Sequence, residues 1–195
     1  SILNQFDSET IINRSKNIFN LLYVLCKNNK TKIIGMDADL NNPSIEYCKN
    51  ISLDYKLFVN TYKKDDIVIN LTNNKKYFFD DIIKAVKENK KICIISLSTK
   101  ILLYVEDLIK KLDNSIMIHT RDTNDETKKL LKYVNELWVK YNIVLFSPTI
   151  SVGVDFTECY FDNVYSIMIP NTASPRCFKQ MLGRIRQMKN NNILS

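Results

Sequence analysis

The sequence predicts an α/β fold in which a mostly parallel sheet carries helices on both faces. The apolar runs "KICIIS" at residues 91–96 and "NIVLFS" at residues 142–147 lack polar alternation, as expected of strands buried on both sides. Amphipathic segments of helical period separate such runs along the chain, which is the order of a parallel α/β sheet. With 195 residues, 45% of them hydrophobic, the chain is long enough for one packed domain and part of another.

The elements are expected to alternate along the whole chain. Residues 9–29 place apolar side chains near helical spacing, and residues 43–51 suit one or two helical turns. Ser98 or Thr99 can cap the helix that follows the strand at residues 91–96, and Ser174 with Pro175 suits the start of the last helix. The expected helices are residues 9–29, 77–89, 99–112, 124–141 and 174–187. The expected strands are residues 32–37, 55–62, 66–72, 91–96, 115–120, 142–147 and 163–169.

Composition limits the classes of function. The net charge of +7 permits an anionic partner but does not identify one, because lysine-rich surfaces are often only solvated. The 5 cysteines form no C-x-x-C pair and His119 is the single histidine, so we expect no metal site. The scattered thiols predict a reducing, intracellular compartment. No apolar run reaches membrane-spanning length and the start lacks a signal-peptide pattern, so we expect no membrane partner.

Polar residues directly follow four predicted strands. In parallel sheets, ligands bind at these C-terminal strand ends. The alternative for any one of these positions is a polar loop that begins where the strand stops. The positions are Asp37, Ala38 and Asp39; Ser96, Leu97 and Ser98; His119, Thr120 and Arg121; and Ser147, Pro148 and Thr149.

Several conspicuous residues have a structural explanation that we prefer. His119 is expected to be a loop or core histidine, although it ends a strand on the ligand side. Trp138 could stack on a base, but its place beside an apolar strand favours core packing. The carboxylates of Asp122, Asp125 and Glu126 suit the first turn of a helix better than a metal site.

The last predicted helix, "SPRCFKQMLGRIRQ", has two different faces. Its apolar face is expected to lie on the core, and it consists of Phe178, Met181, Leu182, Ile185 and Met188. The opposite face carries Arg176, Gln180, Gly183, Arg184 and Gln187. Arginine suits bidentate phosphate contact. A glycine inside a helix costs about 1 kcal/mol relative to alanine, and it lets another backbone or a nucleotide come close.

The stretch "SPTISVGVDF" at residues 147–156 is a second candidate. Gly153 follows a strand and can place its backbone against a ligand, and the carboxylate of Asp155 can orient donors or accept from a ribose or an arginine. A tight turn followed by a cap would explain the same residues without a ligand.

Taken in order, the two stretches resemble motifs V and VI of the C-terminal RecA-like domain of superfamily 2 helicases. "KICIISLSTK" lies where motif IV should be. With "SILNQF", "IIGMDADL" and "VNELWVKYNIVLFSPTISVGVDF", the blocks are most similar to viral replication origin-binding helicases of the herpesvirus type and of other large DNA viruses. The resemblance spans nearly the whole chain, and the order of the blocks is more specific than any one block.

The resemblance implies a domain plan. Residues 1–45 would end a first RecA-like lobe, and residues 46–195 would form most of the second. The ATP- and magnesium-binding P-loop and Asp-Glu pair would belong to the missing N-terminal part of the first lobe. The expected function is therefore the DNA-gripping and arginine-finger half of an ATP-dependent DNA helicase, inactive as an ATPase by itself. The expected location is the nucleus or a cytoplasmic viral replication site of a host cell.

Residue roles follow from the resemblance in the same way. Asp37, Ala38 and Asp39 would couple nucleotide state to DNA grip, although Asp39 departs from the family's threonine. The residues expected at the DNA backbone are Ser96, Ser98, Ser147 and Thr120. Those expected near ATP are Gly153, Asp155 and Gly183, with Gln180, Arg184 and Arg186 as catalytic residues.

One departure concerns the second arginine. The family's final arginine falls at position 187, where this chain has Gln187, and Arg186 stands one residue earlier. On a straight helix Arg186 would point nearly opposite Arg184. Either the helix ends or bends near Ile185, or Arg186 contacts something other than the nucleotide.

Two other functions remain open from the sequence, and a third lacks support. The same lobes drive translocases of restriction or remodelling type, which move on duplex DNA without separating it. A RecA-like domain can also serve as a non-catalytic nucleic-acid-binding module. A small-molecule enzyme with a Rossmann-like fold has no support, because no G-x-G-x-x-G follows any predicted strand.

Overall fold

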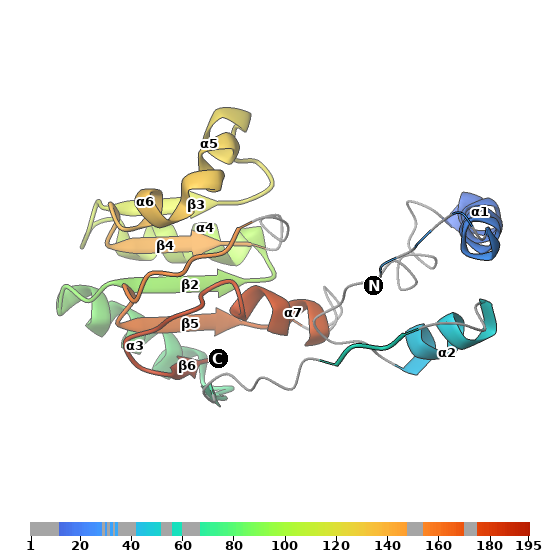
Figure 1. Ribbon diagram of the computed structural model, residues 1–195. Helices are drawn as coiled ribbons and strands as arrows, with labels where there is room; N and C mark the ends of the chain where they lie inside the picture. Colours follow the sequence, from blue (N-terminus) through green and yellow to red (C-terminus); the bar gives the residue numbers. More distant parts are fainter. Residues whose placement is uncertain are drawn as a thin grey trace. The chain divides into compact units, whose positions relative to one another are not determined.

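The computed structural model describes residues 12–28, 30, 32, 34, 42–51, 56–59, 67–147, 154–169 and 175–195. The chain divides into two compact units, Ser1–Lys63 and Lys64–Ser195 (Figure 1). The predicted lobe boundary after residue 45 falls inside the first unit and stays a prediction. No helix in the described part of the chain is long and apolar enough to cross a membrane.

The first unit is helical where it is described. It contains η2 (Ile12–Arg14), α1 (Ser15–Lys27) and α2 (Asn42–Ile51), which confirms both helices predicted there. The rings of Phe19 and Tyr47 meet edge to face, with centroids 5.4 Å apart, and so join α1 to α2. Residues 56–59 form no strand, so the predicted strand at 55–62 is wrong for these four residues. Of the predicted strand at 32–37, only Lys32 and Ile34 are described, and neither is in a strand.

The described residues of the second unit form a sheet of six parallel strands. In chain order they are β1 (Val68–Asn70), β2 (Ile92–Ser96), β3 (Ile116–His119), β4 (Ile143–Phe146), β5 (Asn163–Ile167) and β6 (Asn192–Leu194). In space their order is β1-β6-β5-β2-β4-β3, and every neighbouring pair is parallel. This confirms the predicted α/β fold. β2 lies between β5 and β4 and is completely buried, as its apolar run predicts.

Helices connect the strands. They are α3 (Lys75–Lys87), α4 (Thr99–Ile109), α5 (Asp125–Leu130), η3 (Leu131–Tyr133), α6 (Val134–Trp138) and α7 (Pro175–Leu182). Asn74 caps α3 by accepting from the backbone N–H of Tyr77 at 3.1 Å, and Asn124 caps α5 in the same way. Ser98 stands at the N-cap of α4 as predicted but makes no capping bond with its side chain.

Side-chain alternation along the strands divides the core into two layers. In β2, Ile92 and Ile94 pack with α3 and α4, whereas Cys93 and Ile95 pack with η3, α6 and α7 on the other face. Figure 1 shows the same arrangement of helices on both sides of the sheet. Helical cover on both faces explains why the central strands are apolar throughout.

Candidate functional site

Because all strands are parallel, their C-terminal ends meet at one edge of the sheet. β2 pairs with β4, and β4 pairs with β3, so Ser96, Ser147 and Thr120 end neighbouring strands. The backbone N–H of Ser147 donates to the carbonyl of His119 at 3.0 Å and fixes the two strand ends together. The structure therefore brings together three of the four residues predicted to contact nucleic acid, and Ser98 follows Ser96 directly.

These side chains differ in burial. Ser96, Thr120 and Ser147 are buried, whereas Ser98 is half-buried. Ser96 Oγ accepts from the backbone N–H of Ser98 at 3.1 Å, and Thr120 Oγ1 accepts from that of Asp122 at 3.3 Å. The hydroxyls of Ser96 and Thr120 thus shape the loops at this edge. Their direct contact with a nucleic acid stays a prediction.

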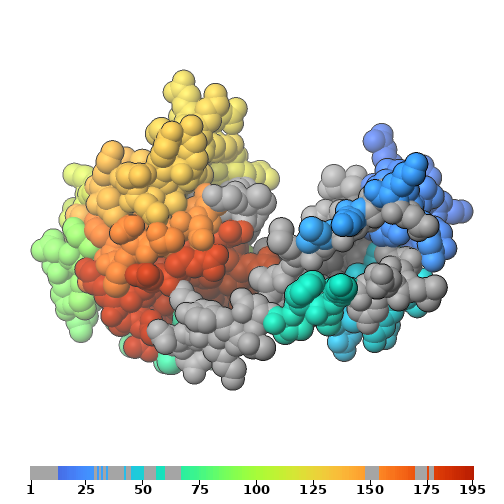
Figure 2. All heavy atoms as spheres, viewed as in Figure 1, coloured from blue at the N-terminus to red at the C-terminus, as the bar shows by residue number. Residues whose placement is uncertain are grey.

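A second group of residues forms where two distant segments meet. Phe156 and Ile185 form an isolated parallel β-bridge. The N–H of Phe156 donates to the carbonyl of Arg184, and the N–H of Arg186 donates to the carbonyl of Phe156, both at 2.8 Å. In Figure 2, red atoms of the C-terminal segment lie against orange atoms of the part of the second unit that precedes it in the chain.

Extended backbone at this bridge decides which side chains face outward. Phe156 and Ile185 are both fully buried, so the neighbouring residues in each segment point away from the core. Arg184 is half-buried, whereas Asp155 and Arg186 are exposed. Arg184 and Arg186 therefore lie on the same side of their segment, beside Asp155.

The two arginines have different partners on this surface. Arg186 Nε donates to Asp155 Oδ1 in a short ion pair. Arg184 Nη1 donates to the backbone carbonyl of Val154 at 3.2 Å. Each guanidinium is thus held by the segment after β4, which contains the predicted Asp155.

The end of α7 explains this geometry and corrects part of the prediction. The helix stops at Leu182, five residues before the predicted end at 187. Gly183 closes the last turn through its N–H to the carbonyl of Lys179 at 3.0 Å, and Arg184 follows in a turn. Of the alternatives for Arg186, the helix does end before it, and Arg186 does contact another group, Asp155.

Within the described residues, no neighbouring atom requires a glycine at position 183. A Cβ added there would lie 3.5 Å from the carbonyl oxygens of Gln180 and Lys179, which is ordinary van der Waals contact. An alanine would therefore fit at position 183 without displacing a described residue. Gln180 is exposed on α7, one turn before Gly183.

Aromatic side chains of the core pack against Phe156, one of the two residues of the β-bridge. The Phe156 ring lies 5.3 Å from the Trp138 ring and 5.1 Å from the Phe161 ring, measured between centroids. Trp138 also stacks on Phe146 of β4 at 5.3 Å, and all four rings are buried. This confirms that Trp138 packs in the core. Its burial fixes Phe156, and Phe156 in turn fixes the orientation of Asp155.

His119 is a core histidine, as predicted. It is 1% exposed, and its Nε2 accepts from Trp138 Nε1 at 3.2 Å. Burial lowers the pKa of His119 from 6.5 to about 4, because desolvation disfavours the charged imidazolium. The ring is therefore neutral at physiological pH, and its proton lies on Nδ1.

Some predicted site residues lie outside the described residues. These are Gly153 and the trio Asp37, Ala38 and Asp39, whose roles stay predictions. Asp125 and Glu126 lie in the first turn of α5, as expected from the preference of carboxylates for helix N-termini. The described residues contain no group of three or more His, Cys, Asp or Glu side chains suited to a metal ion.

The sequence indicated that Asp155 could accept from an arginine, but it did not identify Arg186 as that arginine. A signal was present, since Arg184, Ile185 and Arg186 alternate polar and apolar, as do Val154, Asp155 and Phe156. Chemically, two guanidinium groups on one surface, held by a carboxylate and a carbonyl, form a preorganised cationic site. Such a site suits phosphate oxygens, which accept paired N–H bonds from arginine.

Comparison of the fold with solved structures gives the class. S. cerevisiae Dbp5, solved with RNA and ADP BeF3, matches with a TM-score of 0.66 at 14% identity, over 98% of this chain and 50% of that one. This likeness shows the fold alone. The class defined by the fold is therefore a RecA-like α/β domain of the kind found in helicases.

A family model described as "Origin of replication binding protein" matches residues 54–195, and the chain belongs to this family. A "Putative replication origin-binding protein" of Acanthamoeba polyphaga mimivirus is 35% identical over 171 residues, or 87% of this chain and 21% of the relative. A "Putative helicase/primase complex protein" of African swine fever virus is 26% identical over 97% of this chain and 18% of the relative. The chain thus spans about a fifth of the length of these curated relatives.

Proposed function

We propose that the chain is the second RecA-like lobe of an ATP-dependent viral DNA helicase that acts at replication origins. Family membership and the names of the relatives support a helicase-like replication protein. The observation that carries the finer proposal is the joint surface of Arg184 and Arg186, fixed by the bridge between Phe156 and Ile185. In this proposal Arg184 is the arginine finger and Arg186 is oriented by Asp155.

Bound ATP with Mg²⁺ would supply the phosphoryl group whose transfer to water drives movement on DNA. The residues of this chain suit part of that ligand, because fixed guanidinium groups complement phosphate charge. Arg184, Arg186 and Asp155 would face the nucleotide together with Gly153, while Gly183 leaves room and Gln180 lies at the rim. The sequence contains no G-x-x-x-x-G-K-[ST] motif, so the remaining phosphate contacts and the metal ligands would come from the other RecA-like lobe.

Arg184 has the stronger claim to the finger role. It stands at the arginine of the Gln-x-x-Gly-Arg pattern that Gln180, Gly183 and Arg184 match, and its guanidinium donates to the backbone carbonyl of Val154. Arg186 is paired with Asp155, which reduces the net charge that it offers. Removing Arg184 should therefore affect transition-state stabilisation more than removing Arg186.

DNA would lie along the edge where β2, β3 and β4 end. Ser98, the most accessible of the four predicted contacts, would reach the phosphate backbone with its hydroxyl. Ser96, Thr120 and Ser147 would hold the loops that surround it. We place this activity in the reducing interior of a host cell, in the nucleus or at a cytoplasmic site of viral replication.

The test is ATP-dependent strand displacement by the full-length protein, with triplex displacement measured in parallel. A helicase separates the duplex, whereas a translocase displaces only the third strand. Activity that survives mutation of the P-loop lysine in the other lobe would indicate a non-catalytic binding module. Triplex displacement without unwinding, or no dependence on ATP, would overturn the proposal.

A further inference from the structure

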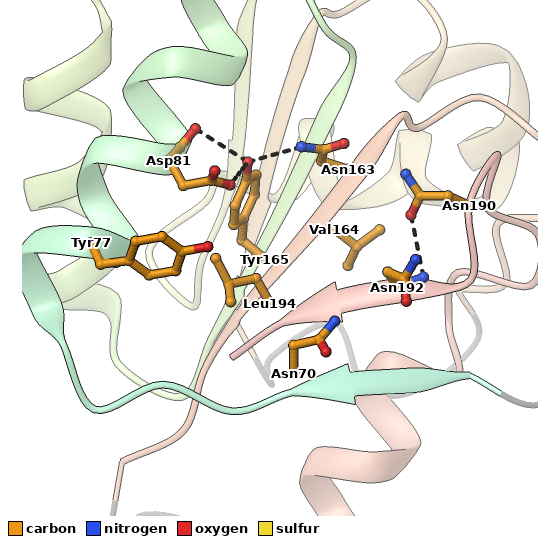
Figure 3. Close-up of a pocket in the computed structure, with 9 residues that line it drawn as sticks. All are labelled: Asn70, Tyr77, Asp81, Asn163, Val164, Tyr165, Asn190, Asn192 and Leu194. Atoms are coloured by element: carbon orange, nitrogen blue, oxygen red, sulfur yellow. Dashed lines mark hydrogen bonds between the residues drawn. The ribbon is translucent and has the colours of Figure 1, made fainter.

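The second unit has a pocket of about 220 Å³ that the proposed ATP site and DNA edge do not use. Residues of β1, β5, β6 and α3 line it, together with Asn190 in the turn before β6 (Figure 3). Tyr165 and Leu194 pack in the core layer of α3, whereas Phe156 and Ile185 belong to the layer of α7. None of the described residues that line the pocket belongs to the arginine site, so the two sites are distinct.

A hydrogen-bond network fixes one wall. The buried Tyr165 hydroxyl donates to Asp81 Oδ2 at 2.8 Å and accepts from Asn163 Nδ2 at 3.0 Å. Figure 3 shows these bonds converging on the hydroxyl. Burial raises the pKa of Tyr165, so the hydroxyl stays protonated and this wall keeps one arrangement.

Three other polar side chains that line the pocket, those of Asn70, Asn192 and Tyr77, are not used in this way. Within the described part of the chain, no hydrogen bond is recorded for the side-chain amides of Asn70 and Asn192 or for the hydroxyl of Tyr77. Asn192 contributes only its backbone N–H, which donates to Asn190 Oδ1 at 3.2 Å. Two carboxamides and a phenol thus border one pocket, offering both donors and acceptors.

Charge and size restrict the ligand. Among the described residues that line the pocket, Asp81 is the only charged one and none is Lys or Arg, which disfavours a phosphate inside it. A volume of about 220 Å³ lies below the roughly 300–1,000 Å³ of sites that hold drug-sized molecules, so a single ring system fits better than a whole nucleotide.

The surroundings favour a ring that belongs to a nucleic acid. Tyr77 is 54% exposed at the pocket and offers an aromatic face for stacking. Lys75 and Lys76 precede it in the first turn of α3 and are exposed, so a backbone phosphate outside the pocket would meet positive charge. A carboxamide matches the donor and acceptor of adenine at N6 and N7.

We propose that this pocket binds a single unstacked nucleobase, with adenine preferred, through Asn70, Asn192 and Tyr77. The base can come from a single-stranded nucleic acid or from a free nucleoside. The proposal goes beyond the helicase assignment and requires no ATP hydrolysis. If the pocket binds no base, the role of the arginine site is unaffected. If the arginine variants keep full ATP hydrolysis, base binding by the pocket is likewise unaffected.

The experiment uses the 195-residue chain, ¹⁵N-labelled, with adenosine as the probe. The side-chain amide signals of Asn70 and Asn192 are expected to shift with adenosine and not with ribose 5-phosphate. Asn70→Ala and Asn192→Ala should each weaken adenosine binding by about two- to tenfold, the value of one hydrogen bond. Asn73→Ala is the matched control, since Asn73 is exposed between β1 and α3 but does not line the pocket.

An oligodeoxyadenosine and the same oligonucleotide with abasic positions distinguish the two sources. Shifts with the intact strand and not with the abasic strand assign the pocket to a base of a nucleic acid. Shifts with adenosine and with neither strand assign it to a free nucleoside. No shift at either asparagine with any probe, or equal affinity for the two alanine variants and the Asn73→Ala control, would overturn the proposal. A retained pattern of backbone signals shows that each variant is folded.

Discussion

Replacing Phe156 with alanine is expected to destabilise the second unit severely. The ring is fully buried and lies within 5.3 Å of Trp138 and 5.1 Å of Phe161, between centroids. Phe→Ala changes in a packed core cost about 3–5 kcal/mol, through lost transfer free energy and the cavity left behind. A domain is stable by only about 5–15 kcal/mol, so this change removes a large part of the free energy of unfolding.

Urea unfolding followed by tryptophan fluorescence measures this loss. Trp138 is the single tryptophan of the chain and is fully buried, so its emission reports on the unit that contains Phe156. Phe156→Leu should cost less, because it keeps an apolar side chain of similar reach. Glu158→Ala, at an exposed position in the same segment, should stay within about 0.5 kcal/mol. A loss below about 1 kcal/mol for Phe156→Ala would refute the claim that the aromatic cluster anchors the segment carrying Asp155.

Three further predictions concern neighbouring residues. Gly183→Ala should change the free energy of unfolding by less than about 0.5 kcal/mol but should lower the rate of ATP hydrolysis by the full-length protein. A rate equal to that of the wild type would contradict a close approach of the nucleotide to Gly183. Because the pKa of His119 is lowered in the folded state, the free energy of unfolding should be unaffected by protonation of His119 above pH 6.5 and should fall by about 3 kcal/mol as the pH drops toward about 4. Unfolding curves with the same pH dependence for the wild type and His119→Gln would contradict this. The side chains of Asp155 and Arg186 are 48% and 50% exposed, so a double-mutant cycle with alanine should give a coupling of about 0.2–1 kcal/mol, and a coupling above ~2 kcal/mol would exclude a solvent-screened pair.

The central strands of the sheet could be predicted because each is marked by an apolar run within a few consecutive residues. β2 and β4 are continuous apolar runs, and their burial on both faces follows directly from that pattern. The last strand, β6, was missed because only Ile193 and Leu194 are apolar among asparagines. Its pairing with β1 and β5 depends on neighbours far away in the sequence, which a local pattern does not show.

Helix boundaries were less predictable, for different physical reasons. The helix predicted over residues 124–141 is divided by a 3-10 turn at Leu131–Tyr133. Leu131, Val134 and Trp138 are all buried against the sheet across this change of helix type, so tertiary packing prevails over continuous helical period. α7 ends early because the carbonyl of Arg184 and the N–H of Arg186 bond to Phe156 instead of continuing the helix.

The arginine site shows the same division between pattern and tertiary structure. The residue types came from the sequence, and the sequence also indicated that a helix end near Ile185 would change the direction of Arg186. The observed partners, Val154 for Arg184 and Asp155 for Arg186, depend on a bridge between segments about thirty residues apart. Long-range pairing of this kind is not visible in side-chain periodicity.

The most direct test of the central claim is the turnover number for ATP hydrolysis by the full-length Arg184→Ala protein with DNA present. If Arg184 acts in the transition state, kcat should fall by at least about tenfold, or ~1.4 kcal/mol, and by as much as ~10³-fold or more if it is the main finger. Lys179→Ala, at an exposed position on α7, should keep the wild-type kcat. A loss below about tenfold for Arg184→Ala would contradict the assignment.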